Sequence, residues 1–260
     1  MKYKFLATLL LALGVTTAVQ AGDNGVYIDQ VGNQATVNIT QTGTSNTFAG
    51  LNPALGPALA KIYGDSNQVG VTQTGGGNQL LFGLDASATG STNTIVYTVT
   101  GSNNQGTIDC NDNGAGKCDH NNIAITQTGD GNTTQLAMVG SNNNVSLTTT
   151  GGNNNNYSFT GTGDHLTSVT NITGGGNGVT ISMMPLLGVA SEANVTLVGA
   201  SNTVGITQSG GSVNGNYANV AITGSGNSAS VTQSGTSADN VTRLQSSGNN
   251  NSFTIIQRAQ

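Results

Sequence analysis

The chain has 260 residues and a formal net charge of −5, with only 7% charged and 4% aromatic residues. So few and scattered basic residues exclude the positive surface that nucleic acids or anionic lipids require, so we expect no nucleic-acid partner. The histidines, His120 and His165, and the one glutamate, Glu192, lie in separate contexts, which gives neither a catalytic triad nor a carboxylate pair. We therefore expect a protein that is not an enzyme and needs no cofactor.

The first 21 residues have the pattern of a secretory signal peptide. Lys2 and Lys4 precede an apolar run over residues 5–15, and Val19-Gln20-Ala21 gives the small-x-small ending of a cleavage site. The run is too short to span a bilayer. We expect cleavage after Ala21, export of the mature chain, and a mature charge of about −7.

A short segment, 22–32, precedes a repeated unit that begins with Asn, continues with alternating apolar residues and ends with Gln-x-Gly. The clearest copies span residues 33–43, 67–75, 202–210 and 227–235. Alternation is the period of a β-strand, and recurrence at a fixed spacing is typical of a solenoid. The polar composition alone would also suit a disordered chain, but the strict alternation favours a folded one.

The spacing of the units predicts the architecture. The opening asparagines recur most often every eleven residues, which fits one strand and a turn, so two units make a coil of about 22 residues. We expect an all-β, two-sheet β-solenoid over residues 33–260, with about eight coils. Pro53, Pro57 and Pro185 fall where the rhythm breaks, so residues near 49–64, 105–120 and 184–192 are expected to be loop insertions.

Asparagine and glutamine recur at inward positions of this pattern. Stacked from coil to coil, their amides can donate to and accept from one another and form ladders along the axis. For the asparagines beside glycine, an ordinary role in turns explains the pattern equally well. The expected ladder residues are Gln41, Gln73, Gln127, Gln208 and Gln233, with Asn33, Asn67, Asn78, Asn132, Asn202 and Asn227.

Cys110 and Cys118 lie in the second insertion. In an exported protein so close a pair is expected to form a disulfide. A metal site that adds His120 lacks a fourth ligand and the usual zinc spacing. Asp109-x-Asn111-x-Asn113-Gly114 is similar to the start of a calcium loop, but His120 stands where the bidentate glutamate belongs. We therefore expect no metal.

The repeat resembles the curlin repeat of bacterial curli fibre subunits. The inward Gln, the Gly two residues later, the following Asn and the alternating apolar residues carry the resemblance, which covers nearly the whole mature chain. It is clearest at Val37–Asn46, Val71–Asn78, Ile125–Asn132, Val204–Gly210 and Ala229–Gly235.

The resemblance implies a β-solenoid that polymerises end to end into functional amyloid. It implies a secreted, cell-surface fibre in the biofilm matrix of a bacterium, with roles in adhesion. The implied partners are further copies of the chain, a second curlin-type subunit, an outer-membrane secretion pore and a periplasmic chaperone. The insertions, the cysteines and the units without Gln depart from the family pattern, and they leave the roles of main subunit, nucleator and specialised variant open.

Two further observations bear on function. The segment Asn251–Gln257 reads as a strand without a cap, so we expect its open edge to be the self-association interface. The alternative is a monomeric solenoid adhesin or ice-binding protein that uses outward Thr-x-Thr pairs. Ser replaces the second Thr at Thr207/Ser209 and Thr232/Ser234, which we expect to break such an array. The pairs are Thr40/Thr42, Thr72/Thr74, Thr98/Thr100, Thr126/Thr128 and Thr148/Thr150.

Overall fold

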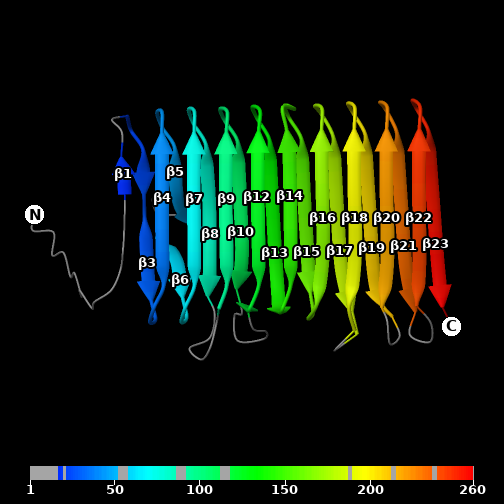
Figure 1. Ribbon diagram of the computed structural model, residues 1–260, viewed down its shortest axis with the longest axis horizontal. Coiled ribbons are helices and arrows are strands. Elements are labelled where there is room, and N and C mark those ends of the chain that lie inside the picture. The colour runs from blue at the N-terminus through cyan, green and yellow to red at the C-terminus, as the bar shows by residue number, and fades with distance from the viewer. Residues whose placement is uncertain are drawn as a thin grey trace, which may run out of the picture.

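Two parallel β-sheets face each other along the whole length of a rod (Figure 1). The computed structural model describes residues 22–51, 58–85, 92–111, 118–186, 189–211, 215–235 and 239–259, and the backbone of Thr17–Val19. This part of the chain contains no helix that is long and apolar enough to cross a membrane. The predicted all-β, two-sheet solenoid of about eight coils is confirmed, with roughly 22–25 residues per coil.

One sheet has ten strands, and each strand pairs in parallel with the next strand of the same sheet. Its order is β1 (Thr17–Val19), β4 (Thr36–Thr42), β7 (Gln68–Thr74), β9 (Thr94–Thr100), β12 (Asn122–Thr128), β14 (Asn144–Thr150), β16 (Leu166–Thr173), β18 (Ser191–Val198), β20 (Asn216–Thr223) and β22 (Asn240–Ser247).

The facing sheet has thirteen strands. They are β2 (Gly25–Val26), β3 (Ile28–Val31), β5 (Thr47–Gly50), β6 (Ala60–Tyr63), β8 (Gln79–Asp85), β10 (Gln105–Asn111), β11 (Cys118–Asp119), β13 (Thr133–Ser141), β15 (Asn156–Thr162), β17 (Gly178–Pro185), β19 (Thr203–Gly210), β21 (Ser228–Gly235) and β23 (Ser252–Ala259). The chain passes from one sheet to the other at each turn, so successive units alternate between the two sheets.

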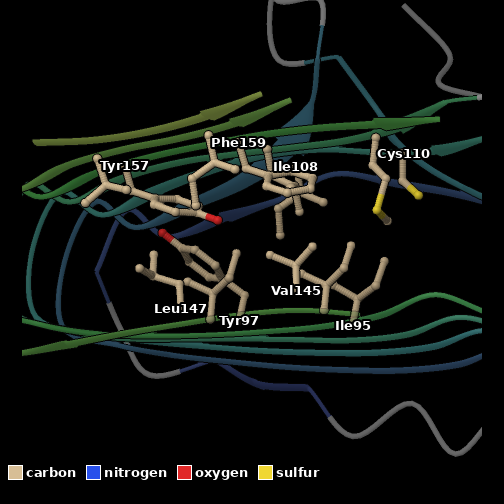
Figure 2. Close-up of a cluster of buried hydrophobic side chains, with 14 of the residues drawn as sticks. Ile95, Tyr97, Ile108, Cys110, Val145, Leu147, Tyr157 and Phe159 are labelled. Atoms are coloured by element: carbon tan, nitrogen blue, oxygen red, sulfur yellow. The ribbon is translucent and has the colours of Figure 1, made fainter. Parts of the chain in front are cut away.

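The core lies between the sheets and is formed by side chains from both of them. Figure 2 shows Ile95, Tyr97, Val145 and Leu147 pointing from the ten-stranded sheet toward Ile108, Cys110, Tyr157 and Phe159 of the facing sheet. All of these side chains are buried, as the alternation predicts. Burial raises the pKa of Tyr157 to about 12 and that of Tyr97 further still, so both phenols are neutral near pH 7.

The turns stack because glycine stands at the same place in successive coils. Gly75, Gly101 and Gly129 all have positive φ, between 115° and 128°. A Cβ added to any of them would overlap a backbone carbonyl of the turn above: Gly101 for Gly75, Gly129 for Gly101 and Gly152 for Gly129. Glycine is therefore required both for the conformation and for the close approach of successive turns.

The predicted insertions are too wide. Near 49–64, β5 and β6 pair one after the other along β8, so the insertion interrupts one strand and does not replace it. Of residues 105–120, the first seven form β10, in full register with β8. The third insertion is shortened in the same way, because β17 runs to Pro185 and β18 begins at Ser191. Proline at 185 is tolerated at the end of a strand.

The solenoid also begins earlier than the predicted residue 33. Gly25–Val26 and Ile28–Val31 already form β2 and β3, which pair with β5 and β6, so residues 22–32 are largely part of the coil. The predicted leader lies outside the described residues except for Thr17–Val19, whose backbone pairs with β4.

The glycine column gives a direct test of the turn geometry. Gly199→Ala is expected to lower the free energy of unfolding by about 2 kcal/mol or more, because φ is +109° and the added Cβ would overlap the carbonyl of Gly224. Gly205→Ala is the control, since its Cβ would meet nothing within 4 Å. Urea unfolding of both variants measures the difference, and equal losses would contradict this account.

Candidate functional site

A column of asparagines runs along one edge of the thirteen-stranded sheet, each directly before a strand. From Asn46 onward, the backbone N–H of each one donates to the side-chain oxygen of the asparagine one coil below, for example from Asn202 to Asn177 Oδ1 at 3.0 Å. The members are Asn24, Asn46, Asn78, Asn104, Asn132, Asn155, Asn177, Asn202, Asn227 and Asn251.

The same amides also hold the turns. Asn202 Nδ2 donates to Asn177 Oδ1 at 3.2 Å and to the carbonyl of Gly224 in the coil above at 2.8 Å. Seven side chains of the column satisfy both a strand N–H and a turn carbonyl in this way: Asn24, Asn46, Asn78, Asn104, Asn177, Asn202 and Asn227. The turn role and the ladder role, which the sequence left as alternatives, are performed by the same residues.

A second column lies along the ten-stranded sheet and is interrupted. Asn67, Asn93, Asn121 and Asn143 repeat the same contact, and the N–H of Leu166 donates to Asn143 Oδ1 at 2.7 Å. Leu166 and Ser191 then occupy the column. The asparagines return with Asn216 and Asn240, joined by a side-chain bond of 2.8 Å.

The structure places the predicted asparagines in different columns. Asn78, Asn132, Asn202 and Asn227 are in the first column and Asn67 is in the second. The prediction that Asn33 is a ladder residue is wrong. Asn33 is exposed in a turn, where its N–H donates to Asp65 Oδ1. Ala35 occupies the position below Asn67 in the second column. The Asn-to-Gln spacing in the sequence already distinguishes the two residues, because Asn33 precedes Gln41 by eight residues and Asn67 precedes Gln73 by six.

The predicted glutamines do not form one ladder. Gln41 donates to Gln73 at 2.8 Å in the ten-stranded sheet. Gln208 donates to Gln233, which donates to Gln257, at 2.9 Å each in the facing sheet. Gln127 has no glutamine neighbour, since Val99 and Thr149 flank it in its sheet; its amide instead donates across the interior to Thr134 Oγ1.

The glutamines at the C-terminal end also tie the two sheets together. The Nε2 atoms of Gln208, Gln233 and Gln257 donate to backbone carbonyls of the facing sheet, at Glu192, Tyr217 and Val241, over 2.9, 2.7 and 2.8 Å. Each bond crosses from one sheet to the other near a strand end. These rungs are therefore fixed by polar contacts as well as by apolar packing.

The ends of the glutamine ladders have buried atoms without partners. Gln73 Nε2 meets no acceptor because Val99 follows in its column, and Gln208 Oε1 meets no donor because Met183 precedes it. An unsatisfied buried amide costs about 1–3 kcal/mol. Glutamine at these positions is therefore favourable only where another polar side chain, in the same column or across the interior, meets its amide.

The two end rungs of the thirteen-stranded sheet carry the same unit. Asn24, Val26, Ile28 and Gln30 occupy the register positions of Asn251, Phe253, Ile255 and Gln257. The apolar residues of both sets, Val26, Ile28, Phe253 and Ile255, are only partly buried and pack on one side against the core. We overlooked the first copy in the sequence, although its Asn-to-Gln spacing of six residues equals that of Asn202 and Gln208.

The position of glutamine along this column is informative. It stands at both ends, as Gln30 and as Gln208, Gln233 and Gln257. The intervening positions of the column are Ile62, Leu84, Cys110, Met138, Gly161 and Met183. Polar residues of the column thus gather near the ends of the rod.

The cysteines form a disulfide at the edge of the coil. The Cα atoms of Cys110 and Cys118 lie 5.8 Å apart, both residues are fully buried, and Asn121 Nδ2 lies 3.3 Å from the Cys118 sulfur. His120 is exposed in a turn with φ +54°, whereas the disulfide is buried. Burial raises the pKa of Asp109, and the centre of the calcium-like segment lies outside the described residues.

The asparagine column can be tested inside the rod. Asn177→Leu is expected to lower the free energy of unfolding by about 3 kcal/mol, because the N–H of Asn202 and the carbonyl of Gly199 both lose a buried partner. Asn171→Leu is the control, since Asn171 faces outward and is exposed. Denaturant titration of the two variants should separate them; a small loss for Asn177→Leu would remove the energetic role of the column.

No family model matches this chain, and no match is found among curated proteins. The resemblance to curlin repeats therefore depends on the repeat residues themselves.

Proposed function

We propose that the chain is a secreted structural subunit of a curli-like extracellular amyloid fibre, which grows by end-to-end stacking of coils. The observation that carries this proposal is the matching pair of half-buried units at the two ends of the thirteen-stranded sheet. The role assigned is structural, in a bacterial biofilm matrix and in surface adhesion, and not catalytic.

The C-terminal rung has an open edge. Within the described part of the chain, β23 pairs with β21 alone and β22 with β20 alone. Their outer edges offer unpaired backbone N–H and C=O groups, and Phe253 and Ile255 are covered on one side. An edge of this kind is a template for another strand in parallel register.

The complementary surface lies at the other end of a second copy. With β23 against its β2 and β3, a continuation of the same register would bring Asn24 next to Asn251 and Gln30 next to Gln257. Gln257 Nε2 already donates one hydrogen to Val241 and has a second hydrogen for Gln30 Oε1. Phe253 and Ile255 would meet Val26 and Ile28, which buries apolar surface on both copies.

The remaining parts of the proposal follow from the resemblance. The leader-like residues 1–21 support export, and the curlin-like repeats support passage through an outer-membrane pore with a periplasmic chaperone. A second curlin-type subunit would begin growth or share the fibre. Whether this chain is the main subunit or the nucleator would follow from its ability to start fibres alone.

Growth from solution is the first expected outcome. Residues 22–260, diluted from denaturant, should form fibres after a lag, and preformed seeds should shorten that lag. Thioflavin T fluorescence measures the growth, and X-ray diffraction of the fibres checks for the cross-β pattern. The physical reason is that the first contact between open rungs is slow and each later addition finds a formed template. A stable, soluble β-rich monomer under these conditions would contradict the proposal and favour a monomeric adhesin.

The open rung itself can be tested with two adjacent isoleucines. Ile255→Lys places an ammonium group inside the junction, where it would lose its water, so seeded growth should stop and small amounts of the variant should slow growth of the unaltered chain. Ile256→Lys is the matched control, because Ile256 faces outward and is 58% exposed. Equal seeded growth rates for the two variants would exclude β23 as the growing edge; circular dichroism checks that both fold.

A further inference from the structure

The paired threonines of the ten-stranded sheet form a continuous two-dimensional array on its outer face. In each of two rows, Thr lies beside Thr on successive strands β4, β7, β9, β12 and β14, with no slip in register. The rows are Thr40, Thr72, Thr98, Thr126 and Thr148, and Thr42, Thr74, Thr100, Thr128 and Thr150.

The Ser-containing units do not break this array, contrary to our expectation from the sequence. Thr207/Ser209 lie on β19 and Thr232/Ser234 on β21, and both strands belong to the thirteen-stranded sheet. Units alternate between sheets, so neighbours in sequence are not neighbours on a face. The array is therefore uninterrupted from β4 to β14, and Thr173 on β16 extends its second row.

The geometry of the array is regular in both directions. Threonines of one row are separated by the distance between strands, about 4.8 Å, and the two rows by two residues along a strand, about 6.7 Å. Figure 1 shows these strands lying nearly parallel with little twist from one to the next. Most sheets twist by more than this, so a flat grid of side chains is unusual.

The face is also uncharged. All of its threonines are at least partly exposed, and every other outward residue of these strands is neutral. Those residues are Thr36, Asn38, Gln68, Gly70, Thr94, Val96, Asn122, Ala124, Asn144 and Ser146. Charges first appear farther along the same sheet, at Glu192 and Arg243.

We infer that this face binds ice, through a layer of water ordered by the threonine grid. The two spacings are close to the repeat distances of oxygen atoms on the prism faces of hexagonal ice. Each threonine offers a methyl group, which restricts the motion of adjacent water, and a hydroxyl, which can hydrogen-bond to it. An ice surface carries no net charge, so an uncharged face complements it, whereas a charged one would retain its own hydration shell. This function is separate from fibre growth, which uses the ends of the rod.

Two substitutions in the same local sequence, Ile-Thr-Gln, test the inference. Thr126→Tyr places a bulky ring in the middle of the grid, and Thr207→Tyr places the same ring at an equally exposed position on the other sheet. The assays are inhibition of ice recrystallisation in polycrystalline ice and incorporation of residues 22–260 into a growing ice front. We expect the unaltered chain and Thr207→Tyr to be active in both, and Thr126→Tyr to lose activity.

Two results would overturn the inference: no activity of the unaltered chain above that of an inert protein, or equal activity of the two variants. Electron microscopy of fibres tests the alternative that this face contacts a second copy of the chain. If Thr126→Tyr changes only the lateral bundling of fibres and leaves ice activity intact, the face is a contact between copies and not an ice-binding surface.

Discussion

The structure depends on one constraint: each strand donates and accepts its backbone hydrogen bonds along the rod axis, in parallel and in register with the coils above and below. A parallel stack places each residue next to its equivalent in the neighbouring coil. The asparagine column, the glycine turns and the threonine rows are all results of this repetition. It also makes the ends of the rod different from its middle, because only there do the backbone groups of a strand edge remain without a coil above or below.

The fold could be predicted from the sequence because alternation assigns each residue to the interior or the exterior. The column to which a residue belongs could not be predicted in the same way, since it depends on register. A shift of two residues removed Asn33 from the ladder and placed Ala35 there. The sheet to which a unit belongs depends on how many units precede it, which the insertions obscure. For this reason the Ser-containing units were placed beside the threonine pairs, although they lie on the opposite sheet.

Polar residues in the interior restrict the register of the stack at a cost in stability. Valine, isoleucine and leucine would fill the glutamine positions of both sheets without unsatisfied atoms, as Leu84 does in β8. Glutamine instead leaves Gln73 Nε2 and Gln208 Oε1 buried without partners. A polar residue in such a column favours a polar partner over an apolar one, so it disfavours wrong registers. In the proposed junction, Gln30 and Gln257 would apply the same preference between copies.

The strand β1 has a further consequence for the shape of the proposed fibre. It fills the first position of the ten-stranded sheet, at the level where β2 and β3 begin the facing sheet. Removal of residues 1–21 takes away one of those ten strands. The thirteen-stranded sheet has ten successive rungs from β2 to β23, about 4.8 Å apart, so one copy spans about 48 Å. With these sheets joined end to end, each boundary would then carry a notch one strand wide on the opposite side, about every 48 Å along the fibre. Such a notch exposes two strand edges to solvent, so a fibre would be open to breakage, or to a strand from another protein, once per subunit.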